Sequence, residues 1–247
     1  MAGGLADKVM LITGAGSGIG QAVAVRLAKE GGAFVLVGRR EANLKETAGM
    51  LGDADVLIQP ADIADPAAVD GVVATTLEKY GRLDLLVNAA GLNVPKRSLA
   101  DSSIEDYQTV ISTDLNGAFY LTRGFLPTMR QQGGGTVINI VSDSGWRGNN
   151  FAGVAYIAAK FGLRGLTEAI NAEERQHGIR ATAIYPGEVN TPILDRRPVP
   201  PPPEARARML QSEDIAECVA LAALLPPRAI IEDLVVRPAI QDWVSRR

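Results

Sequence analysis

The sequence of 247 residues is poor in the side chains that most often build metal sites, disulfides and catalytic triads. It contains one cysteine, Cys218, and one histidine, His177. A single cysteine cannot form an internal disulfide, which fits a reducing compartment. So few His and Cys side chains argue against a His/Cys metal site or a Ser–His triad as the basis of activity. We therefore expect no metal centre.

Long apolar runs and a strong charge of either sign are also missing. The net charge of −3 gives no general attraction to nucleic acid or to an anionic membrane. No apolar run reaches the roughly 18 residues that a membrane span requires. The first residues, MAGGLADK, lack the basic segment and apolar stretch of a secretory signal. We expect a cytoplasmic protein with one domain over residues 1–247 and with no nucleic-acid or membrane partner.

Short β-rich runs alternate with longer helical stretches along the chain. Predicted strands cover residues 8–13, 33–38, 55–59, 83–88, 136–142, 180–185 and 232–237. Predicted helices cover residues 18–31, 41–51, 65–80, 103–130, 154–177 and 212–224, with Asp65 capping the third. Several strands are apolar nearly end to end, as in a parallel sheet covered on both faces. The pattern predicts an α/β fold of Rossmann type: a doubly wound parallel sheet of about seven strands with helices on both faces, in a single domain.

One segment has an unusual composition, RRPVPPPPEARAR at residues 196–208, with four consecutive prolines. Proline has a fixed φ and no backbone donor, which predicts a stiff, extended surface segment. The segment is either a plain connector or, as we favour, part of a substrate lid over residues 191–211.

A glycine-rich turn, TGAGSGIG at residues 13–20, joins the first predicted strand to the first predicted helix. Glycine permits a tight turn and lets the backbone approach a phosphate. The helix N-terminus then offers free N–H groups to a pyrophosphate. The lysine of a P-loop is absent, which argues against nucleotide hydrolysis. The turn predicts a dinucleotide site that includes Gly14, Ser17, Gly18, Ile19 and Gly20.

The second predicted strand ends in Gly38-Arg39-Arg40, where a carboxylate would bind the ribose hydroxyls of NAD. No carboxylate stands at the strand end, and a guanidinium suits the 2′-phosphate of NADP. The alternative is a solvated basic pair partly offset by Glu41. We favour NADP as the cofactor, with NAD possible.

Tyr156 and Lys160 stand four residues apart in YIAAK, which places them on one face of a helix. An ordinary buried helical turn has the same spacing, so the pattern alone does not decide between packing and chemistry. A free tyrosine has a pKa near 10 and is a poor base at neutral pH. The charges of the lysine and of an oxidised nicotinamide stabilise the phenolate, and we expect them to lower the pKa of Tyr156.

With the glycine turn and YIAAK on one chain, the sequence resembles the short-chain dehydrogenase/reductase family from Lys8 to about Pro238. TGAGSGIG looks like the family's cofactor loop, and the NAAG sequence at residues 88–91 resembles a motif beside the cofactor. The segment from Pro186 resembles the one that holds the nicotinamide carboxamide. The resemblance extends the cofactor site to Asp62, at the position that contacts adenine, and to Ile63, Asn88, Ala89, Gly91, Tyr156, Lys160, Pro186, Gly187, Val189 and Thr191.

The resemblance also implies catalytic roles. Tyr156 exchanges a proton with the substrate hydroxyl or carbonyl while hydride moves to or from the nicotinamide. Ser142 hydrogen-bonds the substrate oxygen, with Ser144 as the alternative if the loop is shifted. Lys160 also grips the nicotinamide ribose.

Asp114 departs from the family pattern, because asparagine usually stands at its position in the sequence Asp114-Leu115-Asn116-Gly117. A charge near Lys160 would offset the effect of the lysine and leave the pKa of Tyr156 higher. Asn116 is two residues further on and points away from that face of a helix. We expect the pH optimum for oxidation to be shifted upward.

The sequence thus predicts an NADP-dependent alcohol dehydrogenase or carbonyl reductase for a small-molecule substrate. The alternatives are an NADP-binding regulator with lost or weak turnover, in which Asp114 is the lesion, and an epimerase or dehydratase on the same scaffold. The C-terminal pattern is closer to a subgroup that acts on small hydroxy acids or amino-alcohol compounds.

Candidate substrate-pocket residues lie within 92–97, 143–151 and 194–209. Arg147 either supplies a cationic group for an acidic substrate or faces solvent. The resemblance implies a homodimer or homotetramer packed through the helices at 103–130 and 154–177.

Overall fold

The protein contains one parallel sheet of seven strands in the computed structural model, which describes residues 4–149 and 151–240. The strands are β1 (Val9–Thr13), β2 (Ala33–Gly38), β3 (Asp55–Pro60), β4 (Leu85–Asn88), β5 (Gly135–Ile140), β6 (Ile179–Pro186) and β7 (Asp233–Val236). Their order in space is β3-β2-β1-β4-β5-β6-β7, and every neighbouring pair is parallel. The chain therefore winds outward from β1 to β3 and then crosses to β4, as a doubly wound sheet does.

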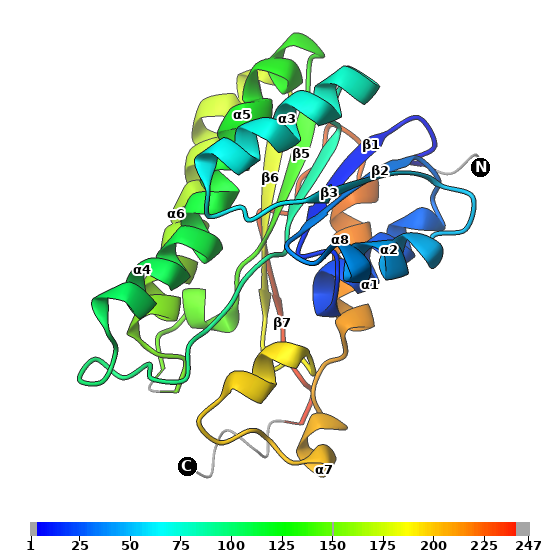
Figure 1. Cartoon of the computed structure of the whole chain (residues 1–247). Helices are drawn as coiled ribbons and strands as arrows, with labels where there is room; N and C mark the ends of the chain where they lie inside the picture. Colours follow the sequence, from blue (N-terminus) through cyan, green and yellow to red (C-terminus); the bar gives the residue numbers. More distant parts are fainter. Residues whose placement is uncertain (1–3, 150, 241–247) are drawn as a thin grey trace.

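Helices cover both faces of the sheet (Figure 1). One face carries α1 (Gly18–Ala28), α2 (Glu41–Gly49) and α8 (Ser212–Leu224). The other carries α3 (Pro66–Tyr80), α4 (Ile104–Ile111), α5 (Gly117–Gln131) and α6 (Val154–Glu174). This three-layer arrangement confirms the predicted fold class.

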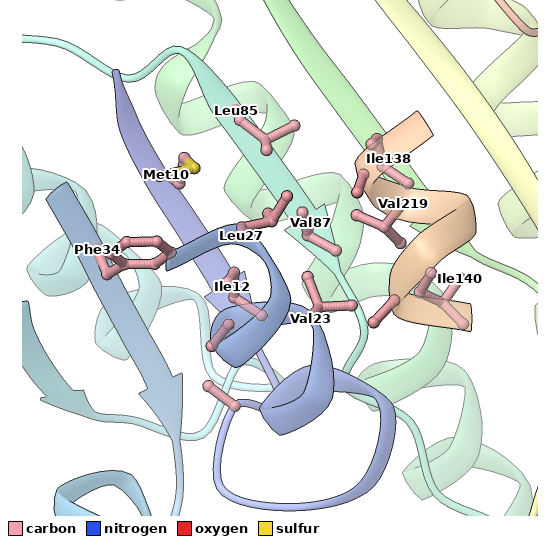
Figure 2. Close-up of a cluster of buried hydrophobic side chains, with 14 of the residues drawn as sticks. Met10, Ile12, Val23, Leu27, Phe34, Leu85, Val87, Ile138, Ile140 and Val219 are labelled. Carbon is pink, nitrogen blue, oxygen red and sulfur yellow. The ribbon is translucent and has the colours of Figure 1, made fainter. Parts of the chain in front are cut away.

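Each face of the sheet has its own apolar cluster, because successive strand residues point to opposite faces. Figure 2 shows the cluster beneath α1 and α8, where buried strand side chains meet Val23, Leu27 and Val219. Met10 belongs to this cluster, whereas the next residue, Leu11, packs on the other face against the helices there. Double-sided burial is the reason that the strands read as continuous apolar runs.

The seven predicted strands and the predicted helices are all present, with ends shifted by a few residues. The Asp65 side chain caps α3 by accepting from the main-chain N–H of Ala67 at 2.9 Å. The predicted helix at 103–130 is divided by a π-helical turn, η1 (Ser112–Asn116), which separates α4 from α5.

Several short helices were not predicted: the 3-10 turns η2 (Asp143–Gly145), η3 (Arg175–His177) and η4 (Pro192–Arg196), and the helix α7 (Pro203–Arg206). The prediction of an extended chain over 196–208 is wrong at its C-terminal end. There Pro203 begins α7, since the fixed φ of proline fits the first position of a helix.

Candidate active site

A cleft of about 320 Å³ lies at the carboxyl ends of the central strands. This is the edge of the sheet where the strand order reverses between β1 and β4, the place where doubly wound sheets bind ligands. The predicted residues that line the cleft are Gly14, Ser17, Gly18, Ile19, Gly20, Arg39, Arg40, Ala89, Gly91, Ser142, Tyr156, Lys160, Pro186, Gly187, Val189 and Thr191.

The glycine turn forms one end of the cleft and needs glycine for steric reasons. Gly14 has φ +65°, and a Cβ there would lie 2.9 Å from the Cα of Ala90. A Cβ at Gly20 would lie 2.4 Å from the carbonyl oxygen of Gly14. Ser17 precedes α1 and makes no side-chain cap hydrogen bond, so its side chain satisfies none of the first-turn N–H groups. The bare backbone and helix N-terminus fit the pyrophosphate of a dinucleotide.

Thr13 fixes the glycine turn to the loop after β4. Its Oγ1 accepts hydrogen bonds from the main-chain N–H groups of Ala89 and Ala90, each at 3.0 Å. The side chain itself is fully buried. This hydroxyl therefore adds to the pairing of β1 with β4 in joining the two walls at this end of the cleft.

A buried chain of amides lies beneath the floor of the cleft. Asn88 donates from Nδ2 to Oδ1 of Asn139, its neighbour in the β4–β5 register, at 2.8 Å. Asn139 in turn donates from Nδ2 to Oγ1 of Thr167 on α6, also at 2.8 Å. These bonds tie the strands under the site to the helix that carries Tyr156.

Arg39 and Arg40 line the cleft beyond the end of β2 and are both exposed. Glu41, the nearby carboxylate, is 2.8 Å from Nζ of Lys45, so it already has a cationic partner. Two guanidinium groups at this position fit an added phosphate on the adenosine ribose.

Lys160 and Asp114 form a buried ion pair behind the cleft. Nζ of Lys160 is 3.4 Å from Oδ2 of Asp114, and the two side chains are 4% and 0% exposed. Lys160 also donates to the carbonyl oxygen of Ile140 at 3.1 Å, while Oδ1 of Asp114 accepts from the N–H of Leu92 at 2.8 Å. Burial raises the pKa of Asp114, although Lys160 and the Leu92 N–H oppose the rise.

Tyr156 shares an apolar cluster with Leu92, Val110 and Ala159, and its ring centroid is 5.4 Å from Nζ of Lys160. Burial raises the pKa of the phenol, and the negative charge of Asp114 adds to the rise. The charge of Lys160 and a hydrogen bond with Ser142 act in the opposite direction. Lys160 therefore acts on the Tyr156 pKa in the predicted direction, but in the protein without cofactor the removal of the phenol from water outweighs it. The predicted influence of Asp114 has the expected sign.

Ser142 and Ser144 both line the cleft, but they have different partners. Oγ of Ser144 accepts from Nδ2 of Asn149 at 2.8 Å. Oγ of Ser142 accepts from the N–H of Ser144 at 3.1 Å and donates to Asp143 at 3.4 Å. Ser142, and not Ser144, also acts on Tyr156 by lowering the pKa of the phenol, which favours Ser142 as the serine of the site.

Some predicted residues lie outside the lining of the cleft. Asn88, Ile63 and Asp114 are buried beside or beneath it. Asp62 is exposed, and its carboxylate accepts from the N–H of Ala64 at 3.1 Å. Arg147 is exposed and is not part of the lining. Of the two predicted alternatives for Arg147, a substrate-binding cation or a side chain that faces solvent, the structure supports the second.

The substrate end contains the polar residues Asn93, Arg97, Arg197 and Glu188. The first three lie within the predicted pocket segments 92–97 and 194–209, whereas Glu188 was not predicted. All of them line the cleft, and Asn93 donates to the carbonyl oxygen of Ala152 at 2.8 Å. Glu188 is paired with Arg197 at 2.8 Å. Residues of η4 close the same side, whereas the four-proline run 200–203 is absent from the lining. These side chains belong to no recognisable motif, and only the fold brings them together.

Two further features concern residues 4–149 and 151–240. In these ranges no group of three or more His, Cys, Asp or Glu side chains is placed to hold a metal ion. Over the same part of the chain, no helix has the length and apolar character needed to cross a bilayer.

Known proteins share both the sequence pattern and the fold. Residues 8–199 match the short chain dehydrogenase family. An uncharacterized oxidoreductase of Staphylococcus aureus is 33% identical over 234 residues, covering 95% of this chain and 98% of its own.

Two solved structures show how closely the fold is shared. An alcohol dehydrogenase from the archaeon Thermococcus sibiricus, complexed with 5-hydroxy-NADP, has a TM-score of 0.85 and 29% identity, over 95% of this chain and 97% of its own. A 3-ketoacyl-(acyl-carrier-protein) reductase from Brucella melitensis, complexed with NADH, has a TM-score of 0.86 and 31% identity, over 95% and 98%. The chain belongs to the short chain dehydrogenase family of oxidoreductases.

Proposed function

We propose that the protein interconverts a small alcohol and its carbonyl compound with NADP(H), and that Tyr156 is the acid and base of the reaction. The observation that carries the proposal is the meeting of Tyr156, Lys160 and Ser142 in the same cleft as the glycine turn. The two related structures described above bind a nicotinamide cofactor and are named for alcohol or ketone chemistry.

The residues divide the chemical work between them. A bound nicotinamide supplies hydride to the carbonyl carbon or accepts it from the carbinol carbon. Tyr156 gives its phenolic proton to the carbonyl oxygen in reduction and takes a proton from the hydroxyl in oxidation. Ser142 hydrogen-bonds the same oxygen, which orients the substrate toward the phenol.

Lys160 keeps a free donor for this work. An ammonium group has three N–H donors, of which Ile140 takes one and Asp114 faces another. The third is available to a ribose hydroxyl of the cofactor. The positive charge of Lys160 meanwhile favours the phenolate of Tyr156.

The preference for NADP rests on Arg39 and Arg40, which line the cleft without a carboxylate at the end of β2. A 2′-phosphate gives both guanidinium groups an anionic partner, whereas the hydroxyl of NAD does not.

The segment 191–211 is proposed to act as a lid. Its first part, η4, already lines the cleft, and Arg97 on the opposite wall donates from Nη2 to the carbonyl oxygen of Arg196 at 2.9 Å. The lid would exclude water from the reacting atoms when a substrate is bound.

The test is cofactor oxidation, followed by absorbance, with a panel of ketones, aldehydes and keto acids. NADPH and NADH are compared, and Tyr156→Phe is measured in parallel. We expect turnover that prefers NADPH and is lost in Tyr156→Phe. Turnover that persists in Tyr156→Phe would assign the proton transfer to another group.

A regulator that binds NADP with little turnover is the second candidate, because Asp114 offsets the charge of Lys160 beside a phenol whose pKa is raised. It predicts that the natural protein binds NADPH without oxidising it, while Asp114→Asn turns over.

We also propose a homo-oligomer that packs through the helical face of α4, α5 and α6. Ile104, Phe119 and Phe161 are 72%, 44% and 42% exposed on this face. Burial of such side chains in an interface removes apolar area from water. Phe161→Glu is expected to reduce the particle mass in size-exclusion chromatography with light scattering, and an unchanged mass would place the interface elsewhere.

A further inference from the structure

The cleft contains a guanidinium group that the proton transfer and the cofactor do not use. Arg97 lies in the loop after β4 and lines the cleft together with Tyr156. The side chain is partly buried, and its Nε is enclosed without a hydrogen-bond partner in the described part of the chain. Its one recorded hydrogen bond uses Nη2, which donates to the carbonyl oxygen of Arg196.

The main chain holds Arg97 against the start of the helix that carries Tyr156. The N–H of Val154 donates to the carbonyl oxygen of Arg97 at 3.1 Å. Gly153, with φ +90°, permits this approach, since a Cβ there would lie 2.4 Å from the Cβ of Arg97. Burial lowers the pKa of Arg97, and the charge of an ionised Tyr156 would oppose this.

The carboxylates near the cleft already have cationic partners. Glu188 is 2.8 Å from Arg197, and Oδ2 of Asp143 is 3.9 Å from Nε of Arg237. Within the described residues, no carboxylate is recorded at ion-pair distance from Arg97. The nearby charge of Arg197 instead opposes it and lowers its pKa. A cation that is withdrawn from water without a counter-ion is unfavourable, and an anionic ligand would relieve that cost.

We propose that Arg97 binds a carboxylate of the substrate, so that the preferred substrate is a small oxo acid or hydroxy acid. The inference rests on the proposed oxidoreductase function and adds the substrate class to it. The planar guanidinium presents its N–H donors in a fork that matches the two oxygens of a carboxylate, and in the described chain Nη1 of Arg97 has no recorded hydrogen bond. Among the described residues, Arg97 is the one partly buried guanidinium lining this end without a carboxylate partner, which favours a singly charged carboxylate over a phosphate.

Arg97 also positions the reacting atoms. A carboxylate held on this guanidinium and a carbonyl oxygen held by Ser142 and Tyr156 fix the substrate at two points. Two fixed points define which carbon faces the hydride and limit the distance between the carboxylate and the carbonyl group.

The first experiment compares three keto acids with their methyl esters as substrates for reduction. The acids are 2-oxobutanoate, 3-oxobutanoate and 4-oxopentanoate, which differ in the spacing between carboxylate and carbonyl. We expect kcat/KM for one acid to exceed that of its ester by roughly 30-fold or more. Arg97→Met should lower kcat/KM for that acid by a similar factor and change that of the ester by less than about threefold.

Two variants serve as controls. Arg147→Met removes an exposed arginine outside the cleft and should leave both activities unchanged. Arg97→Lys keeps the charge but loses the planar fork, so it should retain part of the preference for the acid. Melting temperatures of all variants show whether a loss of activity reflects a loss of fold.

The second experiment needs no turnover. Each acid and ester is titrated by calorimetry into the protein saturated with NADP⁺, a mixture in which a keto compound cannot be reduced. The acid should bind more tightly than the ester in the natural protein, and Arg97→Met should abolish the difference.

The two experiments separate the inference from the proposed function. Binding that depends on Arg97 without turnover of any compound would overturn the enzyme proposal and leave the carboxylate site standing. Turnover with equal use of acid and ester, equal losses of both in Arg97→Met, or the absence of any acid-specific binding would overturn the carboxylate site.

Discussion

Two cations lie near one phenol in the cleft, and the protein balances their charges differently. The ammonium of Lys160 is almost fully buried and has a carboxylate, Asp114, 3.4 Å away. The guanidinium of Arg97 is less buried and has no recorded carboxylate partner in the described chain. Lys160 lowers the pKa of the phenol, whereas the charge of an ionised Tyr156 would raise the pKa of Arg97.

The difference suggests a division of labour. A permanent counter-ion suits a cation that must hold the same place throughout a catalytic cycle, since breaking a buried pair is costly. A missing counter-ion suits a cation whose partner arrives with the substrate and leaves with the product. Four predictions test this difference between the two cations.

Tyr156→Phe removes the phenolic oxygen that is the proposed acid and base, and it has the largest expected effect. Loss of the phenolic oxygen should lower kcat by about 10³-fold for acid and ester substrates alike, because proton transfer is removed from both. Steady-state kinetics measure this loss, and fluorescence titration with NADPH shows whether the cofactor still binds. A fall of less than tenfold would show that the phenol of Tyr156 is not the main acid and base of the reaction.

Lys160→Met and Arg97→Met compare the paired cation with the unpaired one. Lys160→Met leaves Asp114 buried without its partner and should lower the free energy of unfolding by about 3 kcal/mol. Arg97→Met removes a charge that has no counter-ion and should change it by less than about 1 kcal/mol. Urea denaturation of both variants measures the two changes. Equal changes in the free energy of unfolding would show that Arg97, like Lys160, has a counter-ion in the folded protein.

Exposed cations give a third case, in which water balances the charge. Replacing Arg39 and Arg40 together by serine should leave the free energy of unfolding almost unchanged, because both side chains are exposed. The ratio of kcat/KM for NADPH to that for NADH should fall by roughly tenfold, as a charge-assisted contact with the 2′-phosphate is lost. A ratio that does not change would assign cofactor choice to another part of the cleft.

Asp114→Asn has the smallest expected effect, on the pH dependence of oxidation. The phenolate is the active base in that direction, and the charge of Asp114 raises the pKa of Tyr156. Removing this charge lowers that pKa, so the rising limb of the pH–rate profile should move to lower pH by less than about one unit. Glu105→Gln, an exposed acid on α4, is the matched control. A profile that stays in place would show that Asp114 is protonated or screened.

The sequence predicted the cofactor end of the cleft far better than the substrate end. Strands with two buried faces and a glycine turn leave local patterns, so the fold and residues such as Gly14 could be predicted directly. Tyr156 and Lys160 could be paired because they occupy adjacent turns of one helix. Arg97 left no such pattern, since its partners Arg196 and Tyr156 lie far along the chain and meet it only through the fold.

Burial explains the other differences between sequence and structure. The rise in the pKa of Tyr156 depends on how far the phenol is removed from water, which no local spacing reveals. The π turn at Ser112–Asn116 has an unremarkable sequence, because it differs from an α-helix by one step in hydrogen-bond register.

The π turn also affects how the chain can tolerate the insertion or deletion of a residue. A π turn is an α-helix that carries one extra residue, and it absorbs that residue where it occurs. The helices before and after it keep their phases, so Leu121 and Phe125 of α5 still face the core. A one-residue insertion in an uninterrupted helix such as α3 would instead rotate everything beyond it by about 100°. The turn that holds Asp114 is thus a place where a lineage can gain or lose a residue without repacking its core.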